Sequence, residues 1–143
     1  MSGYLLGQAA MRELLRGVAA GESNPVLDWA ERKGSAALYV SELTLARLRS
    51  AAHAVSDPLI REDWLTALNR EVYVTFGARV LPVDRRVLDE WALIERRMLS
   101  TGAMASTVES LAVATAKAHA LTYVARESEL AQEVGCALEN PWA

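Results

Sequence analysis

The sequence has very little cysteine and no long hydrophobic run. Cys136 is the single cysteine among 143 residues, which excludes an internal disulfide and a zinc site built on cysteines. We expect Cys136 to be a small buried side chain in a reducing compartment. No stretch approaches the roughly 20 apolar residues that a membrane-spanning helix needs. The segment from Met1 to Leu6 lacks the basic and long apolar regions of a signal peptide. The sequence therefore predicts a cytoplasmic protein without a membrane partner.

The chain also lacks an excess of positive charge. It has 15 Lys and Arg against 18 Asp and Glu, which gives a formal net charge of -3 and a pI of about 5.4. Proteins that bind nucleic acid through bulk charge are usually basic, so any RNA binding must depend on a local patch. Hydrophobic residues make up 52% of the chain and charged residues 23%, a composition typical of a folded soluble domain. We expect one domain that spans residues 1–143.

Short apolar runs alternate with longer segments of helical periodicity. Candidate strands lie at 4–6, 37–40, 79–83 and 121–124, with a last extended piece at 137–139. Candidate helices lie at 8–16 (ended by Gly17), from Ser23, at 41–54, from Asp57 to Gly77, after Asp84, at 107–120 and at 128–133. This alternation predicts an α/β domain around a mostly parallel sheet. Ligands gather at the carboxyl ends of such strands, here near Gly7, Ser41 and Ala125.

Several of these segments together resemble PIN domains of the VapC toxin kind. The matching pieces are 4–6 with 12–17, 38–45, 80–84, 109–116 with 118–126, and 139–142. They cover nearly the whole chain in the order that the family shows. The resemblance implies a PIN-like α/β/α sandwich. It also implies a ribonuclease toxin of a type II VapBC toxin–antitoxin system, a small VapB-like antitoxin as partner, and a homodimer.

The chemistry of the family depends on a cluster of carboxylates. The resemblance implies that they hold one or two Mg²⁺ or Mn²⁺ ions, because hard divalent cations prefer oxygen ligands. Such ions activate a water molecule and stabilise the charge that develops on the scissile phosphate.

Two acidic positions of the family hold other residues in this chain. The aspartate at the end of the first strand corresponds to Gly7, which has no side chain, and the two polar positions after it correspond to Gln8 and Ala9. The glutamate in the helix after the second strand corresponds to Arg47, which carries a fixed positive charge. We expect little or no Mg²⁺ or Mn²⁺ to bind. Replacing Gly7 by Asp together with Arg47 by Glu should restore some metal affinity.

Three glutamates remain as candidate catalytic residues. Glu109 occupies the position of the family's aspartate at the start of the alanine-rich helix, on a longer stem, and it is the one candidate metal ligand. Glu127 and Glu129 are candidates for the last acidic position after the fourth strand. We expect the Arg47 guanidinium to pair with the Glu109 carboxylate.

Three functions remain open at this point. The first is a VapC-like protein with an impaired or inactive site, which acts through binding of antitoxin or RNA. The second is a working Mg²⁺-dependent ribonuclease that uses Glu109, Glu13 and either Glu127 or Glu129 in a rearranged carboxylate cluster. The third is a structural partner that sequesters antitoxin in a heteromeric complex.

The helices of the 58–100 region are the candidate homodimer interface. The segments around Trp64 and Trp91 carry more large apolar side chains than one small core needs.

Overall fold

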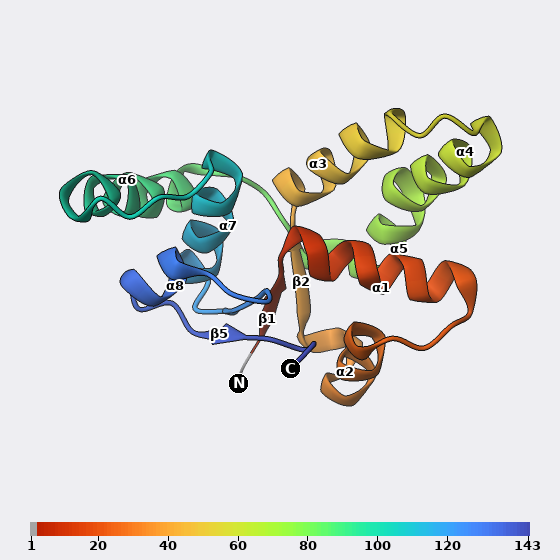
Figure 1. Cartoon of the computed structure of the whole chain (residues 1–143), viewed down its shortest axis with the longest axis horizontal. Coiled ribbons are helices and arrows are strands. Elements are labelled where there is room, and N and C mark those ends of the chain that lie inside the picture. The colour runs from red at the N-terminus through yellow and green to blue at the C-terminus, as the bar shows by residue number, and fades with distance from the viewer. Residues whose placement is uncertain (1–2) are drawn as a thin grey trace.

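Five parallel strands form one sheet at the centre of the molecule, with helices on both of its faces (Figure 1). This computed structural model describes residues 3–143, so the first two residues of the predicted domain lie outside the described part. The strand order is β3-β2-β1-β4-β5. The strands are β1 (Tyr4–Leu6), β2 (Leu38–Ser41), β3 (Val80–Leu81), β4 (Thr122–Val124) and β5 (Leu138–Glu139).

The helices connect these strands and run back across the faces of the sheet. They are α1 (Gln8–Ala20), α2 (Pro25–Lys33), α3 (Glu42–His53), α4 (Pro58–Thr66), α5 (Val72–Phe76), α6 (Arg85–Thr101), α7 (Thr107–Ala118) and α8 (Glu129–Glu133). A π-helical turn at Ala67–Glu71 joins α4 to α5. Within residues 3–143 no helix has both the length and the apolar character to cross a membrane.

Strand β1 shows why both faces of the sheet are covered. Leu5 and Leu6 are both buried, and neighbouring side chains of a strand point to opposite faces. Leu6 packs into a core formed with α1 to α5, whereas Leu5 packs into a second core formed with α6, α7 and α8. In Figure 1 these two groups of helices lie on opposite sides of β1 and β2. The predicted α/β/α fold with a mostly parallel sheet is confirmed.

Helix α7 is buried against the sheet. Ser110 and all five residues from Ala112 to Ala116 are buried. Because small alanines dominate this helix, it can approach β1, β4 and α6 closely.

Two predicted helix boundaries were wrong. Gly17 does not end the first helix, since α1 continues to Ala20 and Gly21 ends it with φ of 64°. Gly17 has a packing role instead, because a Cβ there would lie 2.6 Å from Nδ2 of Asn24. The second helix is capped by Asn24 and not by Ser23, since Oδ1 of Asn24 accepts a hydrogen bond from the Leu27 amide at 2.8 Å.

Candidate functional site

A cavity of about 450 Å³, here called the strand-end cavity, lies where β1 and β4 end and where α1 and α7 begin. It is lined by Gly7, Gln8, Ala9, Thr44, Arg47, Ser106, Thr107, Val108, Glu109, Ala112, Tyr123, Val124 and Ala125. This is the edge of a parallel sheet where ligands usually bind. Gly7 and Ala125, two of the three positions expected there, line the cavity. Ser41, the third, is buried and caps α3 by accepting from the Leu43 amide at 3.1 Å.

Helix α3 supplies Thr44 and Arg47, which lie one turn apart on the same face. Thr44 is 3% exposed, and its hydroxyl has no hydrogen-bond partner among the described residues. Arg47 is exposed, and within residues 3–143 no carboxylate lies in ion-pair distance of its guanidinium. The predicted pairing of Arg47 with Glu109 was therefore wrong, although both residues line the same cavity.

Glu109 is held by a different partner. Its Oε1 accepts a hydrogen bond from Oγ of Ser128 at 2.8 Å. Ser128 is 3% exposed, and its Oγ also accepts from the Ala131 amide at 3.1 Å as the N-cap of α8. One hydroxyl thus fixes the start of α8 and turns the Glu109 carboxylate toward it. Sequence reasoning missed Ser128 as a site residue, although its position before a short helix is typical of an N-cap.

Gly7 leaves room for the side chain of Tyr123. The Gly7 amide donates to the Val124 carbonyl at 3.0 Å, so β1 and β4 stay in contact up to this point. A Cβ at residue 7 would lie 2.8 Å from that carbonyl oxygen and 3.2 Å from both Cε1 and Oη of Tyr123. The φ of Gly7 is -71°, a value open to any residue. Glycine is therefore needed here for space and not for backbone conformation.

Tyr123 is the second residue that sequence reasoning missed. It was assigned to a strand, and its side chain is 6% exposed, yet it lines the cavity and its hydroxyl has no hydrogen-bond partner in the described part of the chain. Burial, and then the nearby carboxylate of Glu109, raise the pKa of Tyr123 to about 12. The hydroxyl therefore keeps its proton at neutral pH and can donate a hydrogen bond.

The other candidate carboxylates do not line the strand-end cavity. Glu127 and Glu129 are exposed, in the segment that leads from β4 into α8. Glu13 lies on α1, with its Oε2 3.8 Å from Nη1 of Arg16. Within residues 3–143 no three His, Cys, Asp or Glu side chains are grouped so that they could hold a metal ion.

No family model matches the chain. It is 27% identical to VapC ribonuclease Y4jK of Sinorhizobium fredii over 117 residues, which cover 82% of this chain and 84% of the relative. It is 27% identical to toxin FitB of Neisseria gonorrhoeae over 105 residues, which cover 73% of this chain and 76% of the relative. The crystal structure of FitAcB from Neisseria gonorrhoeae matches 97% of this chain and 98% of its own, with a TM-score of 0.86 and 25% identity. In sequence and in fold, the chain is similar to VapC-like toxins of the PIN-domain kind.

The strand-end cavity of this VapC-like protein fits Mg²⁺ or Mn²⁺ poorly. Glu109 is the one carboxylate among the lining residues, and Arg47 places a fixed positive charge in the same cavity. Hard divalent cations need several oxygen ligands, and carboxylates also supply the compensating charge. The space beside Gly7, where the resemblance implies an aspartate, is taken up by the Val124 carbonyl and the Tyr123 ring. The residues that line the cavity therefore offer a poor set of ligands for such an ion, with one carboxylate beside one fixed positive charge.

Proposed function

We propose that this chain is the toxin-like member of a VapBC-type toxin–antitoxin pair, with an impaired or inactive nuclease site, and that it acts by binding a small antitoxin. The observation that carries the proposal is the match to FitAcB over 97% of the chain, together with the identity to a VapC ribonuclease and to a toxin. A cavity with one carboxylate and one arginine supports the loss of metal-dependent chemistry.

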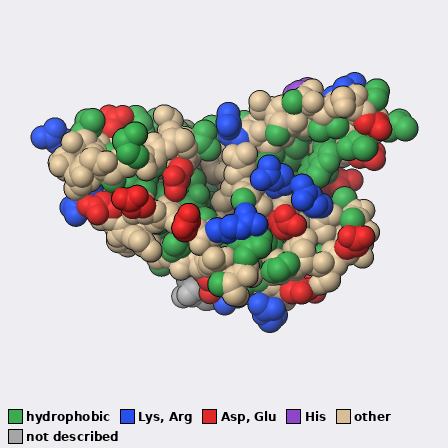
Figure 2. All heavy atoms as spheres, in the orientation of Figure 1, with side chains coloured by type: hydrophobic (Ala, Val, Ile, Leu, Met, Phe, Trp, Pro, Cys, Tyr) green, Lys and Arg blue, Asp and Glu red, His purple; other side chains and the backbone are tan. Residues whose placement is uncertain are grey.

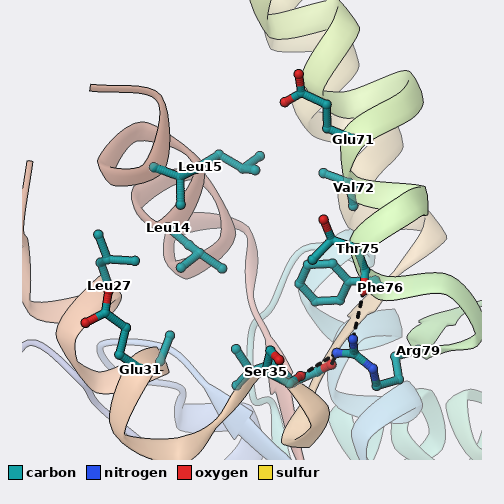
Figure 3. A pocket seen from close by; sticks show the side chains of 13 residues that line it. Leu14, Leu15, Leu27, Glu31, Ser35, Glu71, Val72, Thr75, Phe76 and Arg79 are labelled. Atoms are coloured by element: carbon teal, nitrogen blue, oxygen red, sulfur yellow. Dashed lines mark hydrogen bonds between the residues drawn. The ribbon is translucent and has the colours of Figure 1, made fainter. Parts of the chain in front are cut away.

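An exposed apolar groove supports antitoxin binding. This groove, here called the α1–α5 groove, has a volume of about 390 Å³ and lies between α1, α2 and α5 (Figure 3). Its apolar lining consists of Leu14, Leu15, Val18, Leu27, Ala30, Leu38, Val72 and Phe76. In Figure 3 Leu14 and Leu15 face Val72 and Phe76 across the opening. Apolar grooves of this kind accept the apolar face of a partner helix.

The rim of the α1–α5 groove favours a partner with positive charge. Glu31 and Glu71 lie on the rim. On the face drawn in Figure 2, red acidic and blue basic side chains both stand among green apolar ones. Arg79 also lies there, but it donates to the Leu38 carbonyl at 2.6 Å and to the Thr75 carbonyl at 2.9 Å. Its guanidinium lies 5.1 Å from the Phe76 ring centroid, so Arg79 stabilises the wall of the groove. An amphipathic antitoxin segment with Lys or Arg beside its apolar face fits this arrangement.

Co-expression with any short antitoxin-like protein encoded directly upstream of this gene tests the proposal. The two proteins should co-purify, and Val18→Asp should abolish or strongly weaken the complex, because it places a charge in the groove. Val18 is 65% exposed, so the substitution leaves the core intact. Leu99→Asp is the matched control, since Leu99 is 74% exposed on α6, outside the groove. No co-purification of the original pair would reject the function. Equal losses for both variants would reject the groove as the docking site.

The nuclease part of the proposal is tested with metal and RNA. Isothermal titration with Mn²⁺ should show weak binding, and a gel assay on structured RNA should show absent or very slow cleavage. The alternative of a working nuclease needs Glu13, Glu127 or Glu129 to move into the strand-end cavity beside Glu109. Tight Mn²⁺ binding and metal-dependent cleavage, both lost in Glu109→Gln, would establish that alternative.

A further inference from the structure

The strand-end cavity has several hydrogen-bond donors that nothing in the described structure uses. Thr44 is 3% exposed and Tyr123 is 6% exposed, so both are more than nine-tenths buried. Neither hydroxyl has a hydrogen-bond partner among residues 3–143. Neither oxygen is among the fully buried atoms without a partner in the described residues, so both hydroxyls keep access to solvent, and both side chains line the cavity. These two largely buried side chains therefore offer unused donors to a ligand that enters the cavity and accepts hydrogen bonds from both.

Two helices also begin at this cavity. Helix α1 has 13 residues and α7 has 12, and the first residues of both line the cavity. Gly7, the N-cap of α1, offers no side-chain acceptor to the first amide groups of that helix. The amides at a helix N-terminus and the helix dipole together favour an anion.

The charged residues of the cavity differ from those of a cation site, because an arginine stands beside a single glutamate. Arg47 contributes a full positive charge, and it has no carboxylate within ion-pair distance in the described part of the chain. Glu109 contributes one negative charge, but its Oε1 is engaged by Ser128. The formal charges of Arg47 and Glu109 cancel. Ser106 already caps the start of α7 by accepting from the Glu109 amide, so the uncapped N-terminus of α1 is what leaves the cavity locally positive.

We propose that the strand-end cavity binds a phosphate group directly, through Arg47, Thr44, Tyr123 and the N-terminus of α1, without a metal ion. Tetrahedral phosphate offers acceptor oxygens in several directions, whereas a planar carboxylate offers two. The donors here come from α3, β4 and the start of α1, so they suit the tetrahedral group better. This phosphate site rests on the proposed function, because it assumes that the strand-end cavity corresponds to the nuclease site of VapC-like proteins. It makes the cavity a site that holds a nucleic-acid phosphate without cleaving it.

Titration of the whole chain followed by amide NMR tests the inference. The probes, all with a metal chelator present, are inorganic phosphate, a 5′-mononucleotide and a dinucleotide whose one phosphate is an internal phosphodiester. We expect saturable shifts at the amides of Gln8, Ala9, Thr107 and Val108. A response to the dinucleotide assigns the site to the backbone of a nucleic acid. A response to the other two probes alone assigns it to terminal or free phosphate.

Three substitutions give results that a merely structural cavity would not give. Arg47→Gln and Tyr123→Phe should each weaken phosphate binding about ten-fold, as expected for a lost hydrogen bond to a charged group. Glu109→Gln should tighten it, because it removes the one repelling charge. The same substitution would weaken any metal site, so its sign separates the two kinds of ligand. The controls Arg96→Gln and Tyr39→Phe lie outside the cavity and should leave the affinity unchanged.

The inference fails if no shift saturates at these amides, if Arg47→Gln has no effect, or if Glu109→Gln weakens binding. It also fails if acetate binds as well as phosphate, which would assign the cavity to a protein carboxylate. These measurements use the chain without antitoxin. Loss of phosphate binding with intact antitoxin co-purification would therefore reject this inference alone.

Discussion

Adding one carbon atom at Gly7 is the most direct test of how the strand-end cavity is built. In Gly7→Ala the new Cβ lies 2.8 Å from the Val124 carbonyl oxygen and 3.2 Å from two atoms of the Tyr123 ring system. The first contact is with backbone, so β4 or the start of α1 must move. Overpacking of this kind costs about 1–3 kcal/mol. For a domain of this size we expect a melting temperature lower by roughly 3–9 °C.

The position also caps α1, and capping has to be separated from packing. Alanine is a poorer N-cap than glycine, so part of the loss in Gly7→Ala could come from the cap. Serine is at least as good an N-cap as glycine, and it carries the same Cβ. The packing argument therefore predicts that Gly7→Ser is destabilised as well. Urea and thermal unfolding measure both variants, and a Gly7→Ser protein as stable as the original would refute the reasoning.

The same contacts change what a restored metal site requires. From sequence, Gly7→Asp with Arg47→Glu was expected to recover some metal affinity. In the structure the new aspartate meets Tyr123 and the Val124 carbonyl, so Tyr123 must also be shortened. Tyr123→Val removes two of the three contacts at residue 7 and should lower the cost of Gly7→Ala without abolishing it. The triple variant should bind Mn²⁺ more tightly than the double variant.

Three further expectations concern assembly, pH and the Glu109 support. Leu59 and Leu93 are exposed in the 58–100 region, the candidate dimer interface. Light scattering at tens of micromolar should therefore give a dimer for the original chain and a monomer for the double variant Leu59→Asp with Leu93→Asp. A monomeric original chain would reject that interface. Burial, and then the charge of Arg86, lower the pKa of His119, whose buried Nε2 lacks a hydrogen-bond partner within the described residues. As the pH falls, the imidazole of His119 gains its proton in the unfolded chain before it does so in the folded one. The free energy of unfolding should therefore fall as the pH drops below about 6.5. A His119→Gln variant whose free energy of unfolding changes with pH as in the original chain would contradict this. Ser128→Ala should lower the free energy of unfolding by about 1–2 kcal/mol, because the cap of α8 is lost, and it should also release the Glu109 carboxylate. An unchanged unfolding midpoint would show that the Ser128 hydroxyl is dispensable.

The order of the elements and the fold could be predicted from the amino-acid sequence alone. Leu5, Leu38, Val80 and Tyr123 all lie on strands of one parallel sheet, as expected. The helices expected at Asp57 and after Asp84 also begin there, and Asp84 caps its helix by accepting from the Val87 amide at 3.1 Å. These features depend on apolar periodicity and on hydrogen bonds within about one helical turn. Such information lies within a short stretch of chain and can be read without knowing the fold.

Gly7, Arg47 and Glu109 were also expected to be neighbours, but how they interact depends on tertiary packing. Arg47 and Glu109 line one cavity without pairing, and Ser128 holds the carboxylate in place of Arg47. Tyr123 fills the space beside Gly7 because β1 and β4 are hydrogen-bonded neighbours in the sheet. Side chains from three elements meet there at distances fixed by strand pairing and helix packing. A contact between residues so far apart in the chain depends on that packing, and no local pattern in the sequence encodes it.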